Sequence, residues 1–252
     1  MSANFQEPLL RTRGLTLKFG GITAANNIDF ELRRGERLAV IGANGAGKTT
    51  FINICTGYIK PTSGTVQFDG KDITSVGPRQ IARLGVGRSF QLPQLFLEHS
   101  VRECLELGSV GHAGKLSRLM PMSRTANQRA VAEMLELVEL TPFAREPVTV
   151  LPEGHRKLLD VAIALMLEPR LVIMDEPTSG VAAEDKHGVM KTLMRALQER
   201  EVTSWFVEHD VDIVMAYATR VAAWIDGSIA ADGSPEEVFA NAVVRREVLG
   251  MK

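Results

Sequence analysis

The chain has 252 residues, enough for one large α/β domain or two small ones. Hydrophobic residues make up 45% and charged residues 23%, as in ordinary globular proteins, and a formal net charge of -1 argues against nucleic acid as the main partner. Two cysteines, Cys55 and Cys104, form neither a disulfide framework nor a zinc spacing, which favours a reducing cytosol. We expect no signal peptide at residues 1–8, and no apolar run approaches the roughly 20 residues of a membrane-spanning helix.

The N-terminal part predicts antiparallel strands. Residues 9–19 alternate between apolar and polar side chains, two glycines follow as a turn, and residues 28–32 alternate strictly. Phe19 lies next to these glycines, where an aromatic ring can stack on a nucleotide base. A place in the core or on an edge strand is an equally good interpretation of Phe19.

Residues 42–50 have the form G-x-x-x-x-G-K-[ST], and they follow the apolar run 37–41 and precede a helical segment at 50–55. Glycines let backbone N–H groups point at a phosphate, and the positive end of the helix adds to their field. Lys48 can reach the β- and γ-phosphates, and the Thr49 hydroxyl can hold Mg²⁺. The alternative without a function is a glycine-rich turn that binds nothing. The predicted nucleotide-binding residues are Gly42, Ala43, Asn44, Gly45, Ala46, Gly47, Lys48, Thr49 and Thr50.

A short strand is predicted at 65–68, closed by the hairpin signal Asp69-Gly70. A short helix at 79–84 and a strand at 85–90 follow. Gln91 stands just past the end of this strand, where polar residues of open α/β sheets face the ligand crevice. An ordinary surface glutamine is the alternative.

From residue 100 onward the pattern becomes helical. Ser100 and Glu103 have the spacing of a capping box, 108–121 looks irregular, and 125–140 is an amphipathic helix. A mild basic bias here fits an ordinary solvated surface better than a binding patch; it comes from Lys115, Arg118, Arg124 and Arg129. Residues 151–155 then open a helix that runs to about residue 167, with Pro152 in its first turn.

A continuous apolar run at 171–174 predicts a central parallel strand that ends in Asp175-Glu176. Beside a phosphate loop, Asp175 can coordinate Mg²⁺ and Glu176 can orient or deprotonate a water; an acid pair before a helix is the alternative. After an amphipathic helix at 185–200, the buried strand 202–207 is followed by His209, which could hold a γ-phosphate, although a lone histidine is usually structural. A hairpin at 220–231 and outer helices at 235–249 complete the chain.

The order of these motifs resembles the ATP-binding subunit of ABC transporters over nearly the whole chain. The matching pieces are Phe19 (aromatic loop), 42–50 (Walker A), Gln91 (Q-loop), 151–155 (signature), 171–176 (Walker B) and His209 (switch histidine). The resemblance implies an α/β fold: a P-loop NTPase core with a mixed, mainly parallel sheet, an antiparallel β subdomain and an inserted α-helical subdomain. Residues 1–252 would form a single ABC ATPase domain, with 1–99 and 168–252 as the core and 100–167 as the helical part.

Within the superfamily, four segments look like the branched-chain amino-acid importer ATPases: 17–21, 88–91, 207–210 and 232–250. The function implied is an ATPase that powers import of branched-chain or related amino acids. The similar urea or amide importers are one alternative. A soluble ABC ATPase, regulatory or acting on ribosomes or DNA, is another.

The resemblance also implies roles for residues. ATP and Mg²⁺ would be the cofactors, and the catalytic residues would be Glu176 as general base, His209, Gln91 and Lys48. Thr49, Gln91 and Asp175 would hold the metal, while Leu151 and Gly154 would contact nucleotide on a second ATPase subunit. Integral membrane permeases, and indirectly a periplasmic or extracellular binding protein, would be partners, without nucleic acid, at the cytoplasmic face of the bacterial inner membrane.

Two departures from the family pattern stand out. The signature usually reads L-S-G-G-Q, and Pro152 and Glu153 replace its serine and first glycine. The loop after Walker B usually reads S-G-L-D, and Ala182 replaces its aspartate. These changes lead to the hypothesis that the chain pairs with a different ATPase subunit, with a homodimer as the alternative.

Overall fold

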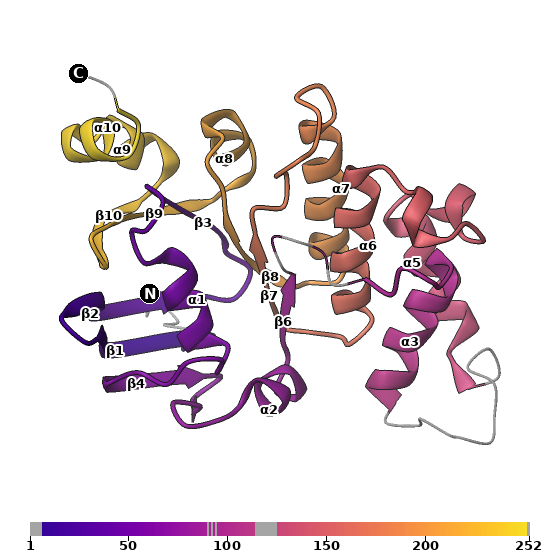
Figure 1. Cartoon of the computed structure of the whole chain (residues 1–252), viewed down its shortest axis with the longest axis horizontal. Coiled ribbons are helices and arrows are strands. Elements are labelled where there is room, and N and C mark those ends of the chain that lie inside the picture. The colour runs from indigo at the N-terminus through magenta and orange to yellow at the C-terminus, as the bar shows by residue number, and fades with distance from the viewer. Residues whose placement is uncertain (1–6, 90, 92, 94, 114–124, 251–252) are drawn as a thin grey trace, which may run out of the picture. The chain divides into compact units, whose positions relative to one another are not determined.

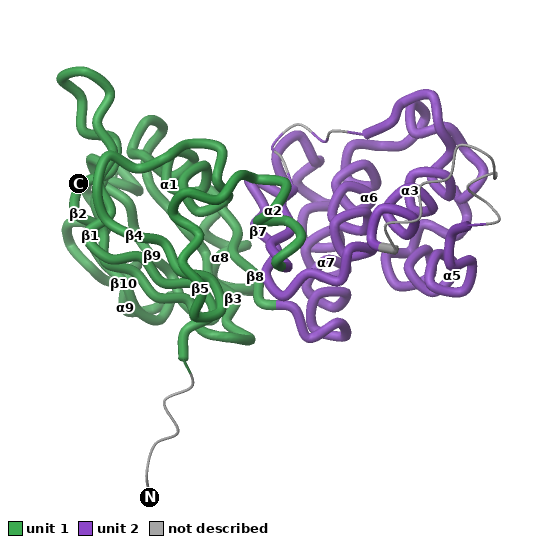
Figure 2. The backbone as a smooth tube through the Cα atoms, turned by 90° about the horizontal axis from the view of Figure 1, so that it is seen from below, with its two compact units in different colours: residues 1–84, 203–252 green, residues 85–202 purple. Residues whose placement is uncertain are grey.

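A computed structural model describes residues 7–250 except 90, 92, 94 and 114–124. The chain divides into two compact units, coloured separately in Figure 2. Unit 1 comprises residues 1–84 and 203–252, and unit 2 comprises residues 85–202. Within the described residues, no helix is long and apolar enough to cross a membrane.

Unit 1 contains an antiparallel sheet with strand order β2-β1-β4-β5; Figure 1 labels its first three strands, β2, β1 and β4. Its strands are β1 (Leu10–Phe19), β2 (Ile22–Leu32), β4 (Ser63–Phe68) and β5 (Lys71–Asp72). The predicted antiparallel strands are confirmed, but β2 begins six residues before the expected position 28. Residues 22–27 lack a regular alternation because the β1–β2 register shifts there, with Leu17 opposite Ala25 and Lys18 opposite Thr23.

Two tight turns follow the rule for Asp-Gly hairpins. Asp69 and Gly70, between β4 and β5, have φ angles of 51° and 72°. Asp226 and Gly227 have φ angles of 47° and 74° between β9 (Arg220–Ile225) and β10 (Ser228–Gly233). Positive φ at both central residues defines a type I′ turn, and Asp-Gly adopts it readily. Both hairpins were predicted from the sequence and are confirmed.

A second set of strands in unit 1 runs in the order β10-β9-β3-β8, with β3 (Arg37–Gly42) parallel to both β9 and β8 (Thr203–Val207). An aromatic cluster includes side chains from two of these strands. The centroid of the Phe51 ring lies 4.8 Å from that of Trp224, 5.3 Å from that of Trp205 and 5.6 Å from that of Phe30. Trp205 and Trp224 are fully buried, so this cluster forms the core of the unit. The helices of unit 1 are α1 (Lys48–Cys55), α2 (Pro78–Arg83), α8 (Val211–Tyr217), α9 (Pro235–Ala240) and α10 (Ala242–Glu247).

Unit 2 has a parallel pair of strands, β6 (Val86–Ser89) and β7 (Leu171–Asp175). Every residue of β7 is buried, as its continuous apolar run predicts. Among the described residues of unit 2, the helical elements are α3 (Val101–Ala113), α5 (Gln128–Leu137), α6 (Glu153–Leu165), α7 (Lys186–Glu199) and the 3₁₀ turns Thr141–Phe143 and Val148–Val150. The long helices lie side by side, α6 between α3 and α7 (Figure 1).

The start of α3 confirms the predicted capping box. The Ser100 backbone N–H donates to Glu103 Oε2 at 2.7 Å, and the Glu103 N–H donates to Ser100 Oγ at 3.3 Å. The expectation that residues 108–121 are irregular is wrong for its first part, because α3 continues through Ala113. Gly108 permits close packing there, since a Cβ at this position would lie 2.9 Å from Cβ of Met166. The rest of that segment, with Lys115, Arg118 and Arg124, lies outside the described residues.

The amphipathic helix expected at 125–140 is α5, which is shorter at both ends. Its first residue is Gln128 because Asn127 caps it, accepting a hydrogen bond at Oδ1 from the Ala130 N–H at 3.2 Å. Its last turn closes before Glu139, which has a φ of 60°. The helix is amphipathic as predicted, with Val131, Met134 and Leu135 buried.

Candidate nucleotide-binding and hydrolysis residues

The phosphate loop of unit 1 connects β3 to α1 and requires glycine at two of its positions. Gly42 has a φ of 155°, and a Cβ there would lie 2.4 Å from the carbonyl oxygen of Trp224. Gly47 has a φ of 102°, and a Cβ there would lie 2.5 Å from the carbonyl oxygen of Ala24. Both ends of the loop are therefore held against neighbouring strands by backbone contacts that only glycine permits.

Lys48 is the first residue of α1, and it is 7% exposed. Its Nζ donates hydrogen bonds to the carbonyl oxygens of Gly42 at 2.6 Å and Ala43 at 2.9 Å, so the side chain reaches from the end of the loop back to its start. Ala43, Asn44 and Gly45 are exposed at its tip. A cation, a helix N-terminus and an exposed glycine loop at one place form a cradle for a phosphate chain.

His209 lies beside the start of this loop. It is the second residue after the end of β8, and β8 runs parallel to β3. Gly42, Ala43, Glu208 and His209 line one small cavity of about 70 Å³, with apolar residues of α8 and the C-terminal helices around it. The structure thus brings together the predicted phosphate loop and the predicted histidine at the carboxyl edge of two adjacent parallel strands, which is where ligands of such sheets bind.

Phe19 is the last residue of β1, and it pairs with Ile22 across the hairpin tip. Its side chain is 52% exposed and that of Ile22 is 72% exposed, so neither belongs to the core. Between the two interpretations of Phe19, this exposure disfavours a core residue. It leaves the ring available for stacking on a flat ligand.

Glu176 follows β7 in unit 2, and its conformation is unusual. Its φ is 52°, in the left-handed region that costs a non-glycine residue about 1–3 kcal/mol. Gln91 Nε2 donates a hydrogen bond to Glu176 Oε2 at 2.8 Å. Two residues that the sequence singled out separately, 85 positions apart, therefore meet through their side chains.

Asp175, the residue before Glu176, is the last residue of β7 and is 6% exposed. Arg88 Nη2 lies 3.9 Å from Asp175 Oδ2, and both side chains are about nine-tenths buried. A buried carboxylate needs such a cationic neighbour. Arg88 was not among the predicted site residues, although an arginine in a short buried strand beside an acidic strand end is a signal for this pair.

The signature segment forms the start of α6. Leu151 is 3% exposed, Pro152 occupies the cap position without a side-chain hydrogen bond, and Glu153 begins the helix. Gly154 is a close-packing residue, because a Cβ there would lie 2.9 Å from a methyl group of Val189 on α7. The His155 ring packs edge-on against Phe143 at 4.7 Å.

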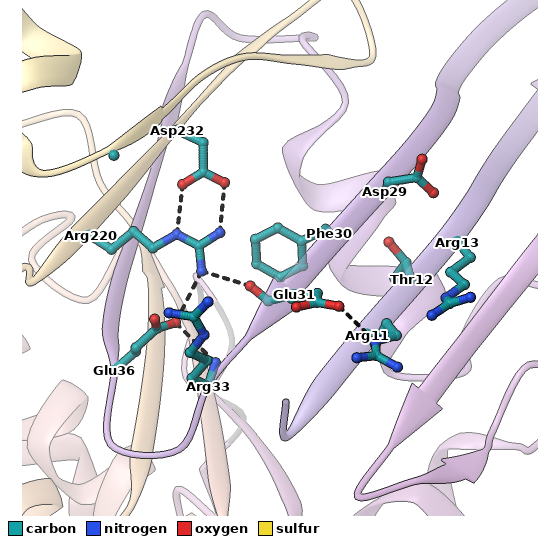
Figure 3. Close-up of a pocket in the computed structure, with 11 residues that line it drawn as sticks. Arg11, Thr12, Arg13, Asp29, Phe30, Glu31, Arg33, Glu36, Arg220 and Asp232 are labelled. Atoms are coloured by element: carbon teal, nitrogen blue, oxygen red, sulfur yellow. Dashed lines mark hydrogen bonds and ion pairs between the residues drawn. The ribbon is translucent and has the colours of Figure 1, made fainter. Parts of the chain in front are cut away.

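Arg220 is a further charged residue that the sequence analysis did not identify, and it stands in an open pocket of about 730 Å³ in unit 1 (Figure 3). It forms a bidentate ion pair with Asp232 at 2.6 and 2.7 Å, and it donates to the Glu31 carbonyl at 2.7 Å and to Glu36 Oε2 at 3.1 Å. Its guanidinium carbon lies 5.5 Å from the centre of the Phe30 ring. The hydrogen bonds to Asp232 raise the pKa of Arg220 above its ordinary value. Arg220 therefore ties β9 to β10, β2 and the turn before β3.

Comparison with known proteins identifies the class. Residues 25–179 match the model of the family described as "ABC transporter". The chain is 34% identical over 250 residues to BraF of Pseudomonas aeruginosa, covering 96% of this chain and 98% of the relative, and 34% identical over 251 residues to LivG of Escherichia coli, covering 97% and 98%. Both relatives are named high-affinity branched-chain amino acid transport ATP-binding proteins.

Solved structures agree with this assignment. An ATP-binding cassette of an ABC transporter in its ADP conformation matches with a TM-score of 0.83 at 30% identity, over 97% of this chain and 98% of that one. The protein cbiO1 from Clostridium perfringens, part of an ABC transporter complex, matches with a TM-score of 0.82 at 30% identity, over 96% and 94%. The predicted P-loop NTPase fold class is thereby confirmed.

The chain belongs to the ABC transporter family. It is an ATP-binding subunit that hydrolyses ATP in support of transport, and it works with a second ATPase subunit and with membrane permease subunits.

Proposed function

We propose that this chain powers an importer of branched-chain or related amino acids. The observation that supports this most strongly is the near full-length identity to BraF and LivG, which are named for this transport. Uptake of radiolabelled leucine, isoleucine and valine by cells that lack the chain tests it. We expect uptake to fall in these cells, to be restored when the intact chain is expressed, and not to be restored by a Glu176→Gln variant. A loss of urea uptake with normal amino-acid uptake would instead support the alternative, a urea or amide importer.

The nucleotide proposed for unit 1 is ATP. The backbone of residues 42–50 and Lys48 would hold its phosphates, and Phe19 would stack on its base. The exposed tip of the loop, and the Lys48 ammonium bound at its start, fit a phosphate chain. His209, at the edge of the same loop, would contact the terminal phosphate.

Mg²⁺ is the metal proposed for this nucleotide, and when bound it neutralises phosphate charge. Thr49, Gln91 and Asp175 would supply oxygen ligands, the donor type that Mg²⁺ prefers. Among the described residues no group of three His, Cys, Asp or Glu side chains could hold a metal by itself.

Glu176 is the proposed general base, and it would accept the proton of the attacking water. The hydrogen bond from Gln91 fixes one carboxylate oxygen and so orients the carboxylate group. General-base catalysis of this kind contributes roughly 10²–10⁴-fold to a rate. The remaining rate enhancement comes from positioning and charge neutralisation.

The proposed assembly is peripheral, at the cytoplasmic face of a bacterial inner membrane. It lies next to permeases, and a periplasmic or extracellular binding protein delivers the solute to those permeases. We further propose that the second ATPase subunit is a different chain. Glu153 places a carboxylate at the start of α6, where the family has glycine and where Leu151 and Gly154 would approach nucleotide on the second subunit. Pro152 offers neither a hydroxyl nor an N–H to that nucleotide.

Placing Glu176→Gln in this chain, and the equivalent change in its partner, tests the unequal pair. The two substitutions reduce ATP hydrolysis unequally if the site completed by Glu153 is the weaker one. Equal losses, or a transporter that is active with two copies of this chain, would contradict the proposal.

A further inference from the structure

Lys157 is a buried lysine in the second turn of α6, two residues after the signature segment 151–155. It is 1% exposed and is among the largest fully buried side chains. Its helix neighbours at spacings of four and eight, Val161 and Leu165, belong to the buried apolar face of α6. An ammonium group in such a place requires acceptors that replace water.

Two of those acceptors are backbone carbonyl oxygens, and they belong to residues whose side chains are proposed to act in hydrolysis. Lys157 Nζ donates to the carbonyl oxygen of Gln91, and it also donates to the carbonyl oxygen of Glu176 at 3.3 Å. The side chains of these same two residues meet at 2.8 Å. One ammonium group therefore joins the backbones of the two residues whose side chains form the proposed catalytic pair.

This arrangement makes the position of Glu176 depend on α6. Glu176 keeps a left-handed φ of 52°, which needs support from its surroundings. Its backbone is held on one side by Lys157, and its carboxylate is held by Gln91. Removing the ammonium removes a contact that joins the two backbones directly and leaves the side-chain hydrogen bond.

We propose that Lys157 is a positioning residue for ATP hydrolysis. It fixes the positions of Gln91 and Glu176 relative to each other, and so links the signature helix to the general base. The inference rests on the proposed role of Glu176. Lys157 does not contact the reacting atoms in this account, and its effect passes through the two carbonyl oxygens.

Lys157→Met tests the proposal, because it replaces the apolar stem of the side chain with one of nearly the same length and removes the charged donor. In the full-length chain assembled with its transporter partners, kcat for ATP hydrolysis falls about 10- to 100-fold, as expected when a catalytic group is displaced by about 1 Å. KM for ATP stays within about twofold, because the phosphate loop of unit 1 is unchanged. Lys191→Met is the matched control, since Lys191 is an exposed lysine on α7, and it leaves both constants unchanged.

A second substitution separates positioning from general damage. If Lys157 acts through the Gln91–Glu176 pair, adding Lys157→Met to Gln91→Ala slows hydrolysis no further than the slower single variant. Losses that multiply in the double variant, or a wild-type kcat in folded Lys157→Met, would overturn the proposal.

If Lys157→Met does not fold, Lys157→Arg serves the same test, because it keeps a cation but changes the reach and geometry of the donor. It lowers kcat at an unchanged KM, and a wild-type kcat would count against the inference. An inactive wild-type assembly would refute the proposed ATPase function itself, whereas an active wild type with unaffected Lys157 variants would refute only this positioning role.

Discussion

Gln91 and Glu176 form a hydrogen bond of 2.8 Å between Nε2 of the amide and Oε2 of the carboxylate. Glu176 follows a fully buried strand, and its left-handed backbone is the kind of local strain that proteins retain at functional sites. The amide leaves the other carboxylate oxygen with a defined direction. The relationship supports Glu176 as the general base and Gln91 as the residue that orients it.

Glu176→Gln removes the base and keeps the shape of the side chain. We expect kcat for ATP hydrolysis to fall roughly 10²- to 10⁴-fold, while the affinity for ATP changes little. Steady-state ATPase assays and equilibrium ATP binding measure the two effects. Glu184→Gln, at an exposed position of the same unit, serves as the control and leaves both unchanged. Wild-type turnover in Glu176→Gln would exclude Glu176 as the base.

Gly47→Ala tests the geometry of the phosphate loop. The new methyl group would lie 2.5 Å from the Ala24 carbonyl oxygen at a φ of 102°, so we expect the loop to shift and ATP affinity to fall at least tenfold. Gly188→Ala on α7 meets nothing within 4 Å, and it is expected to stabilise the fold by about 0.5–1 kcal/mol without changing ATP affinity. Calorimetric binding and thermal unfolding compare the two variants, and equal ATP affinities would contradict this description of the loop.

Arg220→Met tests the ion-pair cluster in Figure 3. Because it removes the four hydrogen bonds that Arg220 donates to Asp232, Glu36 and the Glu31 carbonyl, we expect a loss of about 2 kcal/mol in stability, or roughly 4–8 °C in melting temperature. Arg11→Met removes a single, more exposed ion pair to Glu31 and should cost less than about 1 kcal/mol. Similar melting temperatures for the two variants would show that the cluster adds no more than a surface pair.

The two thiols should resist alkylation in the folded protein. Burial raises the pKa of Cys104 to about 11, and burial raises the pKa of Cys55 far above its usual range. A pKa of 11 leaves about 0.1% of Cys104 as thiolate at pH 8, and the thiolate is the reactive form. Iodoacetamide should therefore label neither cysteine quickly at pH 8, label Cys104 faster as the pH rises, and label both after unfolding. Rapid labelling of the native chain would contradict the burial of both side chains.

The sequence predicted those parts of the fold that depend on short-range rules. Asp69-Gly70 and Asp226-Gly227 formed turns with the φ angles that their type demands. The apolar run before Asp175 formed a fully buried strand, and Ser100 with Glu103 formed a capping box. In each case the determining residues are neighbours along the chain.

Features set by distant contacts were harder to predict. The irregular first half of β2 is fixed by its pairing with β1, and the continuation of α3 past Gly108 is fixed by packing against Met166. Lys157 was not among the predicted site residues, because its acceptors are backbone carbonyls that no sequence pattern marks. Its place on the apolar face of α6 was the available signal.

The most direct measurement for the account is the melting temperature of the full-length chain with and without Mg-ATP, for the wild type and for Lys48→Ala. A ligand at 100 times its dissociation constant stabilises by about 2.7 kcal/mol, so the wild type should melt roughly 5–10 °C higher. Lys48→Ala removes the cation bound at the start of the phosphate loop and should show little of this shift. No shift in the wild type, or an equal shift in Lys48→Ala, would contradict the claim that this loop holds ATP.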